Sequence, residues 1–151
     1  MTVYRITSHS YATDISGEGA RLAGGRWNTA GTSVVYTCEH ISLSILEILV
    51  KADKFTIPDN YTIVSIDLPF DENFSSVELS KLKLNWQQKI NYTQWMGDQF
   101  IKNKESLVLK VPSAIVPQEH NYLINPMHKD FKQVKIFKTE LLNLDKRLML
   151  K

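Results

Sequence analysis

The feature that most constrains the fold is a strand-like run followed closely by a helix-like run. The segment Ser33–Cys38 (SVVYTC) is rich in β-branched and aromatic residues, which favour a β-strand. Residues 42–52 (SLSILEILVKA) carry apolar side chains at helical spacing, which predicts a helix of about three turns. A chain with both patterns must pack a strand and a helix around a common core, so the two kinds of element are expected to be mixed.

Further strands are predicted before and after this unit. They cover Val3–Thr7, Tyr61–Pro69, the run SLVLKVPSAIVP and the run QVKIFKTE. Thr93 is predicted to cap a helix that continues to Ile101. Residues 8–25 are rich in Ser, Gly and Asp and predict a long loop, and NYLINPMH is typical of a turn. Strands and helices do not alternate regularly, so the predicted class is α+β rather than a doubly wound parallel sheet.

Length and charge exclude several classes of function. The chain has 151 residues without a repeat or a linker, which predicts a single domain over residues 1–151. A net charge of +2 is too small for the clustered basic patch of a direct nucleic-acid binder. The most apolar stretch, residues 41–50, is too short to span a bilayer, so no membrane association is expected. Cys38 is the only cysteine, which excludes a disulfide within the chain and favours a reducing cytoplasm.

Glu47 is the candidate carboxylate of the predicted helix. Apolar residues surround nearly the whole helix, so the helix and Glu47 are both expected to be buried. A buried carboxylate must be paired or protonated, as in many functional sites. The structural alternative is a capping box, in which Glu47 reaches back to the backbone of Ser44. Position in the sequence leaves both roles open.

The stretch GGRWNTAGTSVVYT places Arg26 directly after Gly24 and Gly25. Glycines adopt positive φ readily and let a ligand approach the backbone, and an arginine can hold a phosphate with two parallel hydrogen bonds. The alternative is an arginine that pairs with a surface carboxylate. Tyr36 is predicted on the same strand face as Val34, where the alternative is a core tyrosine with a satisfied hydroxyl.

Ser113 lies between Pro112 and Pro117, which restrict the backbone around it. No Gly-x-Ser-x-Gly motif surrounds this serine, so it is not predicted to be a hydrolase nucleophile, and an ordinary turn serine is the alternative. The four histidines lack metal-ligand spacing with one another or with Cys38, so no metal site is predicted.

The order of these motifs resembles the RES domain, the toxin half of bacterial Xre/RES toxin–antitoxin modules. The resemblance runs over nearly the whole chain and rests on VYRIT, GGRWNTAG, VVYTCEHISLSILEIL, VPSAIVPQEHNYLINPMHKDF and DKRL. Residues 70–105 contain little that matches the family.

The resemblance implies a fold like that of ADP-ribosyltransferase toxins, with two small β-sheets facing across a cleft and flanking helices. It also implies NAD⁺ as a substrate, with no cofactor. The catalytic residues that it implies are Arg26, Tyr36, Glu47 and Ser113. The substrate-binding residues that it implies are Arg5, Arg26, Tyr36 and Asn121. In the empty protein, Arg26 and Glu47 are expected to pair and then to separate around NAD⁺.

The function expected from this resemblance is that of a toxin that cleaves the nicotinamide–ribose bond of NAD⁺, as a glycohydrolase or a phosphorylase. An alternative with the same site is a mono-ADP-ribosyltransferase that modifies a host protein. An alternative of another class is a non-catalytic module that binds a nucleotide or a peptide. The expected partner is a helix-turn-helix antitoxin of the Xre type, and a homodimer is expected by analogy only.

Overall fold

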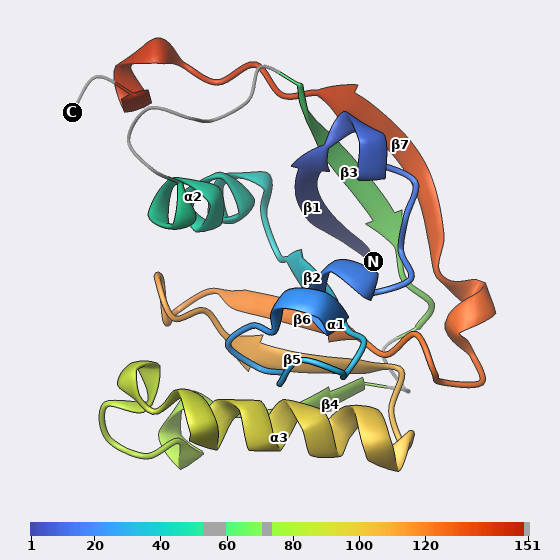
Figure 1. Cartoon of the computed structure of the whole chain (residues 1–151), viewed down its shortest axis with the longest axis vertical. Helices are drawn as coiled ribbons and strands as arrows, with labels where there is room; N and C mark the ends of the chain where they lie inside the picture. Colours follow the sequence, from blue (N-terminus) through green and yellow to red (C-terminus); the bar gives the residue numbers. More distant parts are fainter. Residues whose placement is uncertain (53–59, 71–73, 150–151) are drawn as a thin grey trace.

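The computed structural model describes residues 1–52, 60–70 and 74–149, whose strands join into a seven-stranded sheet. The strand order is β4-β5-β6-β2-β1-β3-β7 (Figure 1). Neighbouring strands run antiparallel except β4 and β5, which are parallel. The strands are β1 (Thr2–Ser8), β2 (Val35–Cys38), β3 (Tyr61–Asp67), β4 (Phe74–Ser76), β5 (Val108–Pro112), β6 (His120–Ile124) and β7 (Lys135–Leu141).

The strand pairing is shortest in the middle of the sheet, between β1 and β2. These two strands pair only at Tyr4 and Cys38, whereas β1 pairs with β3 along its whole length. On the other side, β2 pairs with β6 over Val35–Cys38. The expectation of two separate small sheets is therefore wrong as stated, because the Tyr4–Cys38 pair joins both halves into one sheet. The expected mixture of strands and helices is confirmed.

Helices cover different parts of this sheet. In the described residues, the α-helices are α1 (Glu18–Ala23), α2 (Ile41–Lys51) and α3 (Ile90–Asn103). Helix α2 packs on β1 and β2, and Figure 1 shows α3 running along the β4–β5 end of the sheet. The same part of the chain contains the short 3-10 helices η1 (His9–Tyr11), η3 (Leu79–Lys81), η4 (Trp86–Gln88), η5 (Phe131–Gln133) and η6 (Lys146–Met149). No helix in the described part of the chain is long and apolar enough to cross a membrane.

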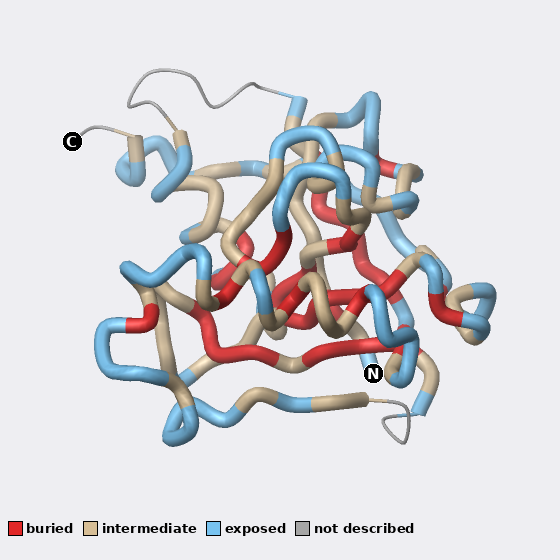
Figure 2. Tube along the Cα trace, turned by 60° about the horizontal axis from the view of Figure 1, so that its bottom comes forward, coloured by how far each residue is buried: buried red, intermediate tan, exposed pale blue. Residues whose placement is uncertain are grey.

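The buried side chains form two clusters. One contains Val3, Val35 and Val64, and the other contains Trp27 and Leu123 with residues of η4, α3 and β5. Side chains alternate between the two faces of a strand, so Val35 and its neighbour Tyr36 belong to opposite faces and to different clusters. Figure 2 shows the buried stretches gathered in the middle of the molecule, with exposed loops around them.

Three predicted elements differ from the structure. The run NYLINPMH, predicted as a turn, contains most of β6, an inner strand that buries Tyr122 and Leu123 between β5 and β2. Its turn-forming residues follow the strand. The loop predicted over residues 8–25 contains η1 and α1. Thr93 does not cap α3, because the helix begins at Ile90 and Thr93 lies inside it. Its hydroxyl instead donates a hydrogen bond to the Arg26 carbonyl, 2.6 Å away.

Candidate functional site

Tyr36 stands near the centre of the sheet, and both hydrogen-bonding roles of its hydroxyl are used. The hydroxyl donates to Asn28 Oδ1 at 2.7 Å and accepts from the backbone N–H of Trp27 at 2.9 Å. Strand alternation places Cys38 on the same face of β2, with Asn121 opposite it on β6. Tyr36 is half-buried, so the residue keeps some contact with solvent.

The loop that carries Arg26 is a tight turn shaped by two glycines. Gly24 has φ of 71°, a left-handed conformation that favours glycine. The Gly25 N–H donates to the Asn28 carbonyl at 3.0 Å, and a Cβ added at Gly25 would lie 2.7 Å from the Tyr36 hydroxyl. The space beside Gly25 is therefore filled by Tyr36 rather than left open for a ligand. This finding corrects the interpretation that both glycines serve close ligand approach.

Arg26 is held by its neighbours through only part of its guanidinium. Its Nη1 donates to the carbonyl of Gln87 at 2.6 Å, and its Cζ lies 6.0 Å from the ring centroid of Trp86. A guanidinium has five N–H donors, so most of them are not used by partners among the described residues. The side chain is half-buried. Arg26 is thus anchored yet still able to bind an anion.

Glu47 differs from the sequence-based expectation in three ways. It is half-buried, since only Leu43 and Ser44 of α2 are fully buried. Helix α2 begins at Ile41, so Ser44 is inside the helix and donates to the Tyr4 carbonyl at 3.3 Å; the capping box is wrong. Within the described ranges, no hydrogen bond or ion pair engages the Glu47 carboxylate, and the expected pair with Arg26 is absent.

Three charged groups act on the Tyr36 hydroxyl. Burial raises the pKa of this hydroxyl above its ordinary value, and the hydrogen bond from Trp27 partly offsets that shift. The Asp98 carboxylate also raises the pKa, Arg26 lowers it, and Glu47 makes a smaller contribution that raises it. Arg26, Glu47 and Asp98 therefore lie within electrostatic range of the Tyr36 hydroxyl, although no hydrogen bond or ion pair joins the Arg26 or Glu47 side chain to Tyr36.

Asn121 and Cys38 lie beside this group on the same face of the sheet. Asn121 Nδ2 donates to Cys38 Sγ at 3.2 Å. Burial raises the pKa of the Cys38 thiol to about 11, a shift to which Glu47 also contributes. The thiol is therefore neutral near pH 7 and unsuited to act as a nucleophile.

Cys38 is expected to react very slowly with a thiol reagent such as DTNB at pH 8 while the protein is folded. With a pKa of about 11, only roughly a thousandth of the thiol is thiolate at that pH. In denaturing guanidinium the same cysteine, the only one in the chain, should react fully and quickly. Equal rates in the folded and unfolded protein would contradict the buried, neutral thiol.

Ser113 does not contact the other candidates. It is fully buried at the start of the β5–β6 connection, where its Oγ accepts from the N–H groups of Ile115 (3.1 Å) and Val116 (3.2 Å). Its own N–H donates to the Glu119 carbonyl at 2.9 Å. One strand of the sheet, β6, separates β5 from β2. Ser113 thus shapes a turn and acts on the site at most through the backbone.

Arg5 also lies apart from the group around Tyr36. Its Nη1 donates to the carbonyl of Asp14 at 2.5 Å, and burial lowers its pKa while the Asp14 carboxylate partly offsets that shift. Tyr4 is the register partner of Cys38, so alternation puts Arg5 on the face opposite to Tyr36. Arg5 holds the segment between β1 and α1 against the sheet.

Sequence reasoning missed the residues of α3 that hold the Arg26 loop. Gln94 Nε2 donates to the Gly25 carbonyl at 3.0 Å, and the Asp98 carboxylate accepts from the N–H and the hydroxyl of Thr29. The two residues in each of these contacts are 69 positions apart in the sequence, so no local sequence pattern predicts them. Asn28, fully buried in the same loop, was also missed, although it stands in the GGRWN run.

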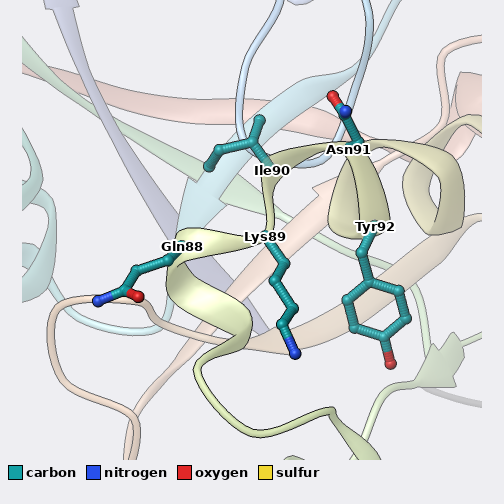
Figure 3. A pocket seen from close by; sticks show the side chains of 5 residues that line it. All are labelled: Gln88, Lys89, Ile90, Asn91 and Tyr92. Atoms are coloured by element: carbon teal, nitrogen blue, oxygen red, sulfur yellow. The ribbon is translucent and has the colours of Figure 1, made fainter.

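A cavity of about 420 Å³ lies where η4 meets α3. Figure 3 shows Lys89 and Tyr92 pointing to one side of it and Ile90 and Asn91 to the other. Its lining starts at Gln88, one residue after the carbonyl that holds Arg26. None of the sequence-predicted site residues lines this cavity. We therefore place the candidate site at Tyr36 and not at this cavity, because the charged groups lie there.

Comparisons with known proteins identify the family of this chain. Residues 2–145 match the family model described as the RES domain. The protein named Toxin Res from Photorhabdus laumondii subsp. laumondii is 35% identical over 153 residues, which cover 99% of this chain and 97% of that protein. The Prs ADP-ribosylating toxin of a Sphingobium species is 36% identical over 145 residues, which cover 93% and 89%.

A solved structure shares the fold at lower identity. A chain of the M. tuberculosis MbcT-MbcA toxin–antitoxin complex superposes with a TM-score of 0.75 over 93% of this chain and 83% of that chain, at 18% identity. Because the family model spans the sheet, the Arg26 loop and α2, the chain belongs to the RES domain family.

Proposed function

We propose that this protein is the toxin of a toxin–antitoxin pair and that it consumes NAD⁺ by cleaving the nicotinamide–ribose bond. The relatives from Photorhabdus and Sphingobium are named as toxins, and one of them as ADP-ribosylating, which is a use of NAD⁺. The observation that supports the proposal is that Arg26 and Glu47 both lie within electrostatic range of Tyr36, while the Glu47 carboxylate has no hydrogen bond or ion pair among the described residues.

The chemistry of the proposed step suits these three side chains. As the bond between ribose C1 and the pyridinium nitrogen breaks, its electron pair neutralises the ring nitrogen and positive charge grows on the ribose, as in glycoside cleavage. A fixed carboxylate next to that charge stabilises the transition state, and Glu47 is the proposed group. Arg26 is proposed to bind the anionic pyrophosphate, and the Tyr36 ring to stack on a base and orient it.

The other candidate residues are proposed in supporting roles. We propose that Asn121 contacts the substrate, because it lies next to Cys38 on the same face of the sheet as Tyr36. Ser113 and Arg5 are proposed to act indirectly, by holding the β5–β6 turn and the segment after β1. We also propose that the sheet with α2 across its centre corresponds to the ADP-ribosyltransferase-like fold.

Incubation of the purified protein with NAD⁺, with and without phosphate, tests the proposal. Mass spectrometry of the products should show free nicotinamide together with ADP-ribose or its phosphorylated form. Intact NAD⁺ after prolonged incubation with folded protein would exclude the enzyme and favour a non-catalytic nucleotide- or peptide-binding module.

A mono-ADP-ribosyltransferase is the second candidate. The name of the Sphingobium relative, 36% identical, favours it. NAD⁺ labelled in the adenylate half, added to a bacterial lysate, separates the two: a labelled protein band indicates transfer, and small labelled products alone indicate degradation.

We further propose that the protein acts in the cytoplasm with a helix-turn-helix antitoxin of the Xre type. The fold shared with a chain of a toxin–antitoxin complex supports an antitoxin partner. The small net charge of +2 supports DNA contact through the antitoxin only. Homodimer formation is a separate proposal, which the mass of the purified protein in solution tests.

A further inference from the structure

We propose that Asn28 is a positioning residue that fixes the orientation of Tyr36 in the site. The proposal rests on the proposed function only for the identity of the ligand that Tyr36 meets. Asn28 has no exposed surface, and its Oδ1 accepts the Tyr36 hydroxyl at 2.7 Å. It lies next to Trp27, whose backbone N–H donates to the same hydroxyl.

The amide nitrogen of Asn28 fixes which way the side chain points. Its Nδ2 donates to the carbonyls of Ala20 (2.8 Å), Thr32 (3.0 Å) and Thr29 (3.1 Å). Three acceptors surround this atom, so it must be the donor nitrogen and the opposite atom must be the acceptor oxygen. An aspartate at this position would place a carboxylate oxygen against those three carbonyls. The chemistry of the pocket therefore specifies an amide.

This contact changes the role available to Tyr36. Its hydroxyl proton goes to Asn28 and one lone pair to the Trp27 N–H, so the hydroxyl is committed to the loop. Proton transfer by this hydroxyl would require breaking a buried hydrogen bond. The half-buried ring remains the part of Tyr36 that can meet a ligand. Asn28 thereby fixes the plane of the Tyr36 ring through its hydrogen bond to the hydroxyl.

The same contacts connect the ring to the Arg26 loop. Asn28 closes the turn with Gly25 through two backbone hydrogen bonds, of 3.0 and 3.4 Å, and Arg26 lies inside that turn. A shift of Asn28 would move both the Tyr36 ring and the Arg26 backbone. The two side chains that we propose to bind NAD⁺ are thus oriented by one buried amide.

A double-mutant cycle with Asn28→Ala and Tyr36→Phe tests this role, with Asn125→Ala as the matched control. Asn125 is equally buried and bonds to Ile101 and Met127, away from Tyr36. Asn28→Ala is expected to raise KM for NAD⁺ about tenfold with a smaller change in kcat, and to add little in the Tyr36→Phe background. Asn125→Ala is expected to lower stability without raising KM.

Two results would overturn the proposal. One is a KM effect of Asn28→Ala that is unchanged when Tyr36 is phenylalanine, or that is matched by Asn125→Ala. The other is a Tyr36→Phe variant whose kcat falls by about a hundredfold or more at unchanged KM, which would make the hydroxyl a proton-transfer group. This second measurement needs no Asn28 variant and decides the question if Asn28→Ala does not fold.

The same double-mutant cycle is also measured by urea unfolding, which reports stability and does not depend on activity. Non-additive shifts of the unfolding midpoint show that Asn28 and Tyr36 are coupled even if the wild type leaves NAD⁺ intact. That outcome would reject the proposed function and retain the positioning contact. Additive shifts, together with a wild type that cleaves NAD⁺, would reject the positioning contact and retain the proposed function.

Discussion

Replacing Glu47 with glutamine is expected to lower kcat for NAD⁺ cleavage by roughly a hundredfold or more. Glutamine keeps the size of the side chain but loses the negative charge that we propose to stabilise the positive ribose. Folding should be unaffected, because Glu47 is half-buried and has no hydrogen bond or ion pair among the described residues. The measurement is a steady-state assay of nicotinamide release, with thermal unfolding of both proteins beside it.

Glu140→Gln is the matched control for this variant. Glu140 lies on the edge strand β7 and pairs with Lys138 at 2.9 Å, both exposed. An exposed pair of this kind contributes little to stability, so the control should cleave NAD⁺ at the wild-type rate. Wild-type kcat in Glu47→Gln would remove Glu47 from the chemistry and leave Arg26 and Tyr36 as a binding site only.

Replacing Gly97 with alanine is expected to destabilise the protein by about 3 kcal/mol, at the upper end of overpacking effects. Helix α3 approaches the Arg26 loop so closely that a Cβ at Gly97 would lie 1.6 Å from the Trp27 carbonyl oxygen. The helix must move away from the loop to admit the methyl group. Thr93 and Gln94, which bond to the Arg26 and Gly25 carbonyls, would then lose their contacts.

Gly19→Ala is the control for the effect of alanine in a helix. Gly19 lies in α1, where an added Cβ meets nothing within 4 Å. Alanine there is expected to stabilise by roughly 0.5–1 kcal/mol, because glycine is a poor helix former. Urea unfolding measures both variants, and a Gly97→Ala protein as stable as the wild type would mean that α3 does not rest on the Trp27 backbone.

Local sequence patterns predicted most of the strands and the central helix. The strand predicted over Val3–Thr7 lies within β1, and the strand predicted over Ser33–Cys38 contains β2. The helix predicted over residues 42–52 is α2, which begins and ends one residue earlier. These segments carry a clear period of apolar residues, which local sterics and burial both favour. Of the predicted site residues, Arg26 and Glu47 lie within electrostatic range of the Tyr36 hydroxyl, and their roles in the site stay predictions.

The predictions failed where long-range contacts decide the outcome. Turn-forming residues directly follow strand β6, and only its position between β5 and β2 makes His120–Ile124 a strand. Helix α2 is apolar on most sides, yet one flank is left partly exposed because the sheet covers only one side of it. Glu47 therefore remains half-buried and does not pair with Arg26.

By itself the sequence determined the types of the main elements, the chemistry available to the site, and the family through the order of its motifs. Only the tertiary structure decided which of these residues meet. Arg5 and Ser113 belong to the same motif set as Tyr36, but they hold other segments, at Asp14 and in the β5–β6 turn. Asn28 reaches Tyr36 through a buried hydrogen bond. Such contacts depend on strand register and on α3 packing, which join residues far apart in the chain and leave no periodic signal in it.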